Sequence, residues 1–374
     1  MRDPTGCRMH VSSIIVRRRF LTSLTSLLAV AGLAPRRLAA GEIRPTIAIR
    51  FSLDRPINAG AASVVMAAAD SLFGAEGLSV AIDVAHGSAD AIARVAAGDS
   101  DAALVDLNEL IRFRGKAAAP RIKAVFVLFN RAPYAIVARR SRGIRALVDL
   151  EGKTLGVADG DLSIRLWPAL ARHNGIRSAN VTQSHLSAAV REPMLSAGQV
   201  DAVTGFSYLS AVNLRDRGVP AYDLAVLRYA DYGCEAYGFA VIVNPAFAAA
   251  RPGAVKGLLR ALVAGTQVSI REPKRTADEV ASRMNDGSPD IELERLRSVI
   301  ADNILTSEVK RDSIGGIDPA RLDRSIDQIA EDFKFEKRPS ARDIFDDSFL
   351  PPPAERLINR AEVPPPLYRP PNPD

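Results

Sequence analysis

The sequence predicts an α/β fold with two lobes, and three features of its patterning indicate this. Short β-branched and apolar runs alternate with stretches of helical length, which is typical of largely parallel sheets. A first series of alternating strands and helices is followed by loops that contain Gly143 and Gly152, and a second series begins after them. Residues 245–300 follow with an almost wholly helical pattern. We therefore expect two lobes, with the chain returning to the first lobe after the second.

The first cycle begins with a strand at 46–51 (TIAIRF), because this run is rich in β-branched residues. The Ala-rich stretch 61–73 has the length of a helix and follows that strand. Ser88 is the expected N-cap of the next helix, with Asp90 in its first turn. The other expected elements are strands at 78–84, 102–105, 122–129 and 134–138, and helices at 88–98 and 107–113.

The second cycle repeats this alternation after residue 153. A strand at 154–157 leads through a tight loop into a helix at 162–173, for which Asp161 is the expected N-cap. Residues 350–374 are rich in proline and should hold neither helix nor sheet, so we expect a solvated or surface-draped tail there. Further strands are expected at 181–184, 202–204 and 240–243, and helices at 188–197 and 208–217.

Residues 1–40 have the features of an export signal. Three arginines and Phe20-Leu21 precede a short apolar run, and Leu38-Ala39-Ala40 precedes Gly41, an order typical of a secretory signal of the twin-arginine type. The apolar run of about 10 to 14 residues is shorter than the roughly 20 that span a bilayer. We expect cleavage near Ala40 and a periplasmic product. Met1 and Met9 both remain possible starts, and the general export route remains an alternative.

Charge and cysteine content exclude several classes of function. Residues 1–40 contain seven Arg and one Asp, which leaves 42 basic and 42 acidic side chains in the rest of the chain. A part without net charge gives no support to nucleic-acid binding. Cys234 is the single cysteine after residue 40, so no internal disulfide is expected. The four histidines lack the spacing of a zinc site, and we expect no metal, no cofactor and a monomer.

The common catalytic motifs are missing from the sequence. It contains no Gly-x-Ser-x-Gly elbow, no phosphate-binding Gly-x-x-x-x-Gly-Lys-Ser/Thr loop and no Gly-x-Gly-x-x-Gly after the first strand. Cys234 has no positioned base in the sequence, and a packed thiol is the simpler interpretation. We therefore expect a binding protein rather than an enzyme, although a rarer exported enzyme stays an alternative.

Polar and aromatic residues recur in loops at the carboxyl ends of the expected strands, where open α/β sheets bind ligands. A helix that starts there would also aim free N–H groups into the same space. Taken singly, each residue could equally be a cap or a turn residue. The set comprises Asp54, Asn58, Ser88, Asp106, Asp161, Ser163 and Phe206.

The segment 229–238 is a more specific candidate, because it holds three tyrosines and an aspartate between glycines. Such a loop could stack on a planar ligand and bind its edge, or its rings could lie on the core. In the first interpretation Tyr134, Phe206, Tyr232 and Tyr237 contact the face of the ligand. The candidate residues of the segment are Tyr229, Asp231, Tyr232 and Tyr237.

Several motifs together resemble the substrate-binding proteins of bacterial ABC importers, in the branch that binds thiamine pyrimidines, sulfonates, taurine and nitrate. The resemblance is collinear from 47 to 349. The motifs are GAEGL at 74–78, GSAD at 87–90, AGDSDA at 97–102, PYAIV at 133–137, LEGKTLG at 150–156, AGQVDA at 197–202 and the segment 229–238.

The resemblance implies a two-lobed type II periplasmic binding protein with two crossover strands, near 134–139 and 238–243. Lobe 1 would comprise 44–137 and 242–345, and lobe 2 would comprise 138–241. The lobes would close on a ligand and present it to an ABC permease at the inner membrane. A sensor partner of a membrane receptor is an alternative that would bind its ligand in the same way.

The identity of the ligand does not follow from the resemblance. Pyrimidine binders tend to carry an aromatic residue and a histidine after the first strand, whereas this chain has LDRPINAG at 53–60. Four aspartates fall in the expected cleft loops, and an unpaired carboxylate would repel an oxyanion. This favours a neutral or amine-bearing planar ligand over a sulfonate, unless Arg55, Arg165 or Arg228 points into the cleft.

Overall fold

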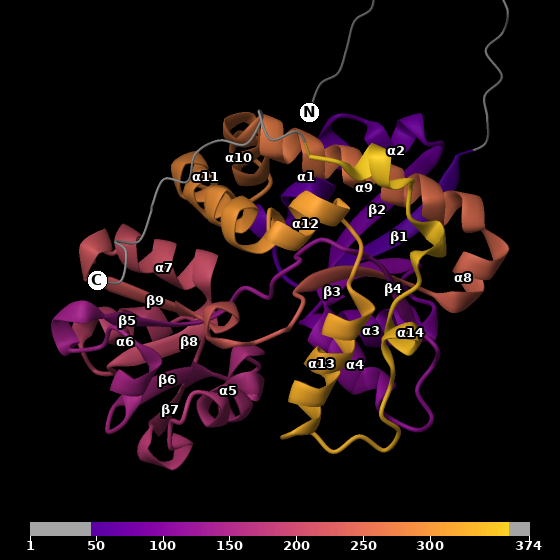
Figure 1. The fold of residues 1–374 in the computed structure, drawn as a ribbon. Helices are drawn as coiled ribbons and strands as arrows, with labels where there is room; N and C mark the ends of the chain where they lie inside the picture. Colours follow the sequence, from indigo (N-terminus) through magenta and orange to yellow (C-terminus); the bar gives the residue numbers. More distant parts are fainter. Residues whose placement is uncertain (1–45, 359–374) are drawn as a thin grey trace, which may run out of the picture. The chain divides into compact units, whose positions relative to one another are not determined.

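The structure is a computed structural model that describes residues 46–358 (Figure 1). The expected export signal, its cleavage near Ala40 and the tail from 359 onward lie outside these residues. Within them, no helix combines the length and the apolar character that crossing a membrane requires.

The first sheet has the strand order β2-β1-β3-β10-β4. Strand β1 lies parallel to β2 and β3, whereas β10 lies antiparallel to β3 and β4. Every side chain of β3 is buried, as expected for a strand covered on both faces. The strand bounds are β1 Ile47–Leu53, β2 Leu78–Val84, β3 Ala102–Asp106, β4 Lys123–Val127 and β10 Phe239–Val243.

The second sheet repeats this arrangement with the order β7-β6-β8-β5-β9. Here β6 lies parallel to β7 and β8, and β5 is the antiparallel strand between β8 and β9. The strand bounds are β5 Tyr134–Arg139, β6 Thr154–Ala158, β7 Thr182–Leu186, β8 Ala202–Phe206 and β9 Leu224–Arg228.

The two sheets exchange one strand each, and this defines the fold. Strand β5 follows β4 in the chain but belongs to the second sheet, and β10 returns to the first. The α/β fold with two lobes and two crossovers is therefore as predicted. The expected division after 137 and after 241 cuts through both strands. Sheet membership instead changes before Tyr134 and before Phe239, because β5 pairs with β8 from Tyr134 onward and β10 pairs with β3 from Phe239 onward.

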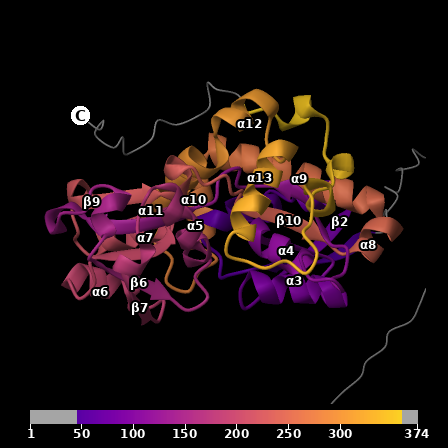
Figure 2. The same ribbon diagram turned by 60° about the horizontal axis from the view of Figure 1, so that its bottom comes forward.

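Helices cover the first sheet, and α9 is the longest of those described (Figure 2). It packs along α1 at Gly265, where a Cβ atom would collide with the backbone carbonyl of Ser63. The bounds are α1 Ala62–Ala69, α2 Leu72–Ala75, α3 Ser88–Ala97, α4 Leu107–Arg114, α8 Pro245–Ala250, α9 Pro252–Arg271, α10 Pro273–Ala281, α11 Pro289–Ser298, α12 Ser307–Asp312, α13 Pro319–Ala330 and α14 Ala341–Ile344. In the second lobe they are α5 Trp167–His173, α6 Arg191–Ala197 and α7 Ser207–Asp216.

The described part of the proline-rich tail packs against the first lobe. Pro353–Arg356 form a single 3₁₀ turn, although neither helix nor sheet was expected there. The Arg356 side chain is buried and donates to the backbone carbonyls of Pro351 and Ile314. Gln267 of α9 donates to the carbonyls of Glu355 and Leu357, and the backbone N–H of Ile314 donates to that of Arg356, so several separate contacts hold the tail at this point.

Candidate functional site

The site begins where β1 ends, at a buried carboxylate. The Asp54 side chain is 3% exposed and accepts a hydrogen bond from Ser88 Oγ at 2.7 Å. The same Ser88 hydroxyl oxygen accepts from the backbone N–H of Asp106 at 3.0 Å. Ser88 was expected to be the N-cap of α3, but Gly87 takes that position with a φ of 98°. The hydroxyl is therefore available to join the ends of β1 and β3.

Asp106 connects the first sheet to the second. It is fully buried and accepts from Tyr134 Oη at 2.6 Å and from Asn108 Nδ2 at 2.9 Å. Asn108 Nδ2 also lies 2.8 Å from the carbonyl oxygen of Tyr237, on the second crossover. Burial raises the pKa of Asp106 to about 6, against the opposing effect of these hydrogen bonds. The Asp106 carboxylate therefore lies beside the first residue of β5 and close to the residues that precede β10.

Aromatic side chains from both sheets meet beside this carboxylate. Phe206, at the end of β8, lies 6.0 Å from Tyr134, 6.2 Å from Tyr208 and 5.8 Å from Phe239 between ring centroids. Tyr134 also meets Tyr229 edge-on at 6.1 Å. We call Tyr134, Phe206, Tyr208, Tyr229 and Phe239 the aromatic group. Because Phe239 belongs to the first sheet and the others to the second lobe, the group spans the two lobes.

Arg55 places its guanidinium in this aromatic group. Its Nε and Nη2 donate to the two oxygens of Asp54 at 2.9 and 2.7 Å. Its Cζ lies 4.4 Å from the ring centre of Phe206 and 4.7 Å from that of Phe239. Burial would lower the pKa of Arg55, but the adjacent Asp54 outweighs this and raises it, so the side chain is a permanent cation.

Asn58 and Tyr208 close the space beside Arg55. Tyr208 Oη lies 3.3 Å from Asn58 Oδ1, and Asn58 caps the 3₁₀ helix Ala59–Ala61 through the N–H of Gly60. A Cβ atom at Gly60 would lie 2.7 Å from Tyr208 Oη, so this approach requires glycine. The remaining cavity is only about 10 Å³, roughly the space of one water molecule.

The second lobe contributes a further polar group. Asp161 accepts from Ser163 Oγ at 2.6 Å, from Thr204 Oγ1 at 2.5 Å and from Arg191 Nη1 at 3.0 Å. Tyr229 is buried close by, and its hydroxyl has no hydrogen-bond partner within residues 46–358. Burial, and then the charge of Asp161, raise the pKa of Tyr229. Tyr229 thus connects the polar group around Asp161 to the aromatic group through its contact with Tyr134.

Residues 58–276, more than half of the chain, match the family model described as NMT1/THI5 like. The chain belongs to the NMT1/THI5-like family. This membership and the structures below confirm the resemblance to ABC-importer binding proteins that the sequence motifs indicated. No curated protein matches the sequence.

Solved structures with similar folds include periplasmic binding proteins. The aliphatic sulphonate binding protein of Escherichia coli is 15% identical, over 79% of this chain and 96% of that one, with a TM-score of 0.63. The alkanesulfonate-binding protein of Xanthomonas axonopodis pv. citri, bound to MOPS, is 16% identical over 81% and 99%, with a TM-score of 0.60. The nitrate-binding protein of Synechocystis is 10% identical over 81% and 87%, with a TM-score of 0.58. These identities show a shared fold alone.

Three candidate residues of this NMT1/THI5-like chain lie apart from the aromatic group. The Asp231 carboxylate pairs with Arg228 at 2.8 Å and is 41% exposed. Tyr232 is half-buried, and its carbonyl accepts from Asn174. Tyr237 is buried on the far side of the second crossover, where its hydroxyl bonds to Glu308 at 2.8 Å. For Tyr229 and Tyr237, the structure matches the alternative in which the rings lie on the core.

Sequence reasoning did not include four residues that shape the site. Arg55 was considered only as a residue that could alter the preferred ligand, and Tyr208, Asn108 and Phe239 were not singled out. One signal was present in the sequence, since Tyr208 lies four residues after the expected strand end at Thr204, and β8 in fact ends at Phe206. Strand-to-helix junctions of open α/β sheets place such residues at the sheet edge. No local sequence pattern predicted that Phe239, at the start of β10, would pack against Phe206.

Two features bear on catalysis and metal binding. Burial raises the pKa of the Cys234 thiol to about 11, so at neutral pH it is not the thiolate that a nucleophile requires. Among residues 46–358, no group of three or more His, Cys, Asp or Glu is arranged to hold a metal ion. A larger hollow of about 700 Å³ lies beside residues 345–356, but none of the candidate residues lines it.

Proposed function

We propose that this chain is the exported solute-binding component of an ABC importer. It captures a small organic ligand, aminopyrimidine-like or sulfonate-like, between its lobes and delivers it from the periplasm to a permease at the inner membrane. The observation that carries the proposal is the meeting of strand-end residues from both sheets on one aromatic group beside the crossovers. A ligand there would contact both lobes and so favour their closed arrangement.

The charge argument for the ligand changes with the structure. The preference against oxyanions assumed unpaired aspartates, but Asp54, Asp161 and Asp231 each pair with an arginine, and Asp106 is held by Tyr134. That assumption is therefore wrong for Asp54, Asp161 and Asp231, whereas the hydrogen-bond donors of Asp106 are the uncharged side chains of Tyr134 and Asn108. The rings of Phe206 and Phe239, over which the planar Arg55 guanidinium lies, support a planar ligand without excluding a sulfonate.

The first test is to identify and titrate the ligand. Mass spectrometry of the protein purified from the periplasm would identify what it carries. Titration of that compound into the Phe206→Ala and Tyr208→Ala variants should show affinity losses of about 1 to 3 kcal/mol each, because a stacking face is removed. The control is Tyr222→Ala, since that ring is 80% exposed. Unchanged affinity in both site variants would overturn the proposal.

Two further measurements separate transport from its alternatives. The compound should be recovered unchanged after long incubation with the protein, whereas an exported enzyme would convert it. Deleting the gene should abolish uptake of the compound. A sensor partner would instead leave uptake intact and remove a response to the compound.

A further inference from the structure

We propose that Arg55 is an internal stand-in for the ligand, and that the cleft selects planar cations of the guanidine and amidine class. This inference rests on the proposed function and specifies its ligand. The Arg55 guanidinium occupies the space where strand-end residues of both lobes meet. The residues that hold this guanidinium would hold a ligand of the same shape and charge in the same way.

The contacts of Arg55 are those that a planar cation with two adjacent N–H donors would make. Two donors meet both oxygens of Asp54, at 2.9 and 2.7 Å, the bidentate geometry that matches a guanidinium to a carboxylate. The rings of Phe206 and Phe239 lie 4.4 and 4.7 Å from its central carbon, within the range of cation–π attraction. The two rings come from different lobes, so the cation links the lobes.

Asp54 would require another cation if Arg55 withdrew. Its carboxylate is 3% exposed, and an isolated charge at that depth is strongly unfavourable. The hydrogen bond from Ser88 at 2.7 Å would keep the carboxylate in position. A planar cation restores the lost pairing, whereas a sulfonate placed there would add a second negative charge.

Arg55 is placed to leave the cleft. Its side chain is 27% exposed, and it sits in the irregular segment between β1 and the 3₁₀ helix Ala59–Ala61. Asp54 is the one hydrogen-bond acceptor of its guanidinium within the described residues. The cavity of about 10 Å³ beside it admits no ligand, so binding requires the side chain to move. Competition of this kind lowers the apparent affinity for a ligand.

Calorimetric titration of methylguanidine and methanesulfonate into wild type, Arg55→Ala and Arg55→Gln tests the inference. Both variants should bind methylguanidine at least about tenfold more tightly than wild type, because the internal competitor is gone. Adding Asp54→Asn to Arg55→Ala should abolish that gain. Arg177→Ala is the control, because that arginine pairs with Glu151 inside the second lobe and its removal should give no gain.

Two results would overturn the inference. One is tighter methanesulfonate binding by the Arg55 variants, and the other is no gain for methylguanidine in either folded variant. If Phe206→Ala still loses the co-purified compound in those cases, the proposed function stands and only the ligand class is wrong. If Phe206→Ala and Tyr208→Ala both bind that compound normally, the proposed function itself fails. A rise in the melting temperature of Arg55→Gln with methylguanidine, absent in wild type, would support the inference independently.

Discussion

Asp106 joins the two sheets through a single buried carboxyl group. It lies at the end of β3, and its partner Tyr134 is the first residue of β5. The bond between them measures 2.6 Å, and the Asp106 side chain is fully buried. Burial favours the neutral form of the acid, so its pKa is raised to about 6. The protonation state of Asp106 therefore affects its hydrogen bond with Tyr134, which connects the two lobes.

Asp106 should make stability depend on pH. Its folded pKa of about 6 exceeds the ordinary value of 3.8, so the folded state binds the proton more tightly than the unfolded state. Its stabilising contribution is complete below about pH 4 and is lost as the pH rises through about 6. Over this pH range, the free energy of unfolding of the wild-type protein should fall by about 2 to 3 kcal/mol relative to that of Asp106→Asn. Urea unfolding of both proteins from pH 4 to pH 7 measures it, and parallel curves would contradict the prediction.

Three polar residues that the sequence placed at strand ends come together in the structure, whereas the expected aromatic residues Tyr232 and Tyr237 lie apart from them. Asp54, Ser88 and Asp106 were expected together because the carboxyl ends of parallel strands share one edge of a sheet, and they form one hydrogen-bonded chain. Tyr237 was expected at the ligand because of the composition of 229–238 and the resemblance of that segment to binding proteins. Composition does not say which side of a crossover a ring will face, and Tyr237 faces α12 and α13.

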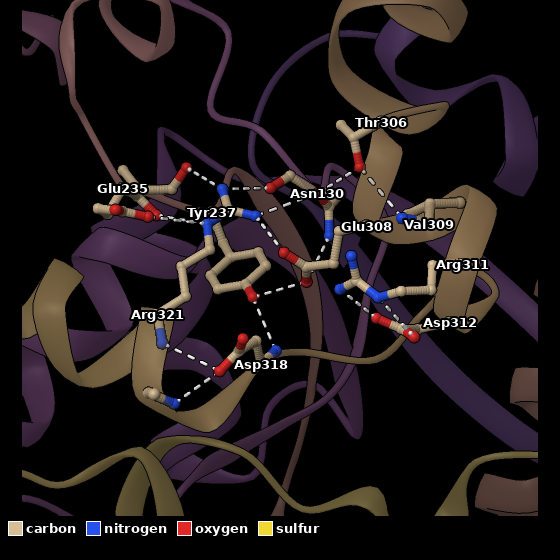
Figure 3. A network of polar contacts seen from close by, with 12 residues as sticks. Asn130, Glu235, Tyr237, Thr306, Glu308, Val309, Arg311, Asp312, Asp318 and Arg321 are labelled. Carbon is tan, nitrogen blue, oxygen red and sulfur yellow. Dashed lines mark hydrogen bonds and ion pairs between the residues drawn. The ribbon is translucent and has the colours of Figure 1, made fainter.

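At the scale of elements, one arginine of α13 holds both crossovers (Figure 3). Arg321 donates to the carbonyl of Asn130 on the first crossover at 2.8 Å and to that of Glu235 on the second at 3.0 Å. Its guanidinium also pairs with Glu308 at 2.8 Å and lies 4.0 Å from the centre of the Tyr237 ring. Helix α13 thus fixes the two segments between which any hinge motion must occur.

Arg321→Ala should destabilise the protein by about 3 kcal/mol, because it leaves buried carbonyls and a carboxylate without their partner. The side chain is only 12% exposed. Arg324→Ala is the matched control on the same helix, since that side chain is 56% exposed and pairs with Glu235 at 3.4 Å. Its cost should be below about 1 kcal/mol. Equal midpoints for the two variants in urea unfolding would show that the contacts of Arg321 with the two crossover segments add no special stability.

The elements themselves were largely predictable, including the two crossover strands, whereas the expected lobe bounds cut through those strands. Runs of β-branched and apolar residues located β5 and β10 well, because burial on both faces requires them. Pattern alone does not reveal which sheet a buried strand joins. That choice depends on pairing with β8 and β3, which are distant in sequence.

For the whole molecule, exposed ion pairs supplement the buried contacts between the lobes. Arg165 of the second lobe pairs with Glu109 of α4 at 2.7 Å. Arg172 of α5 pairs with Glu331 at 2.8 Å and Asp332 at 2.9 Å, just after α13. Both arginines are 40 to 50% exposed, so each pair contributes little to folding. Their effect should instead appear in the balance between open and closed arrangements.

The double variant Arg165→Ala, Arg172→Ala should therefore bind its ligand about two- to fivefold more weakly. The loss of two exposed pairs corresponds to about 1 kcal/mol of the closed form. Calorimetric titration of the co-purified compound measures this. The control is Arg177→Ala, since that arginine is 77% exposed and pairs with Glu151 inside the second lobe. Equal affinities of double variant and control would mean that these pairs do not bias closure.

The exchange of β5 and β10 also determines the order in which the lobes can be completed during synthesis. All five strands of the second sheet lie between Tyr134 and Arg228. The first sheet begins earlier in the chain, yet its strands β3 and β4 have an unfilled place between them until Val243 is made. The lobe that starts second is thus the first whose sheet can close. Until then the first lobe has two unpaired strand edges, on β3 and β4. Such edges are sites where unfinished chains associate with one another.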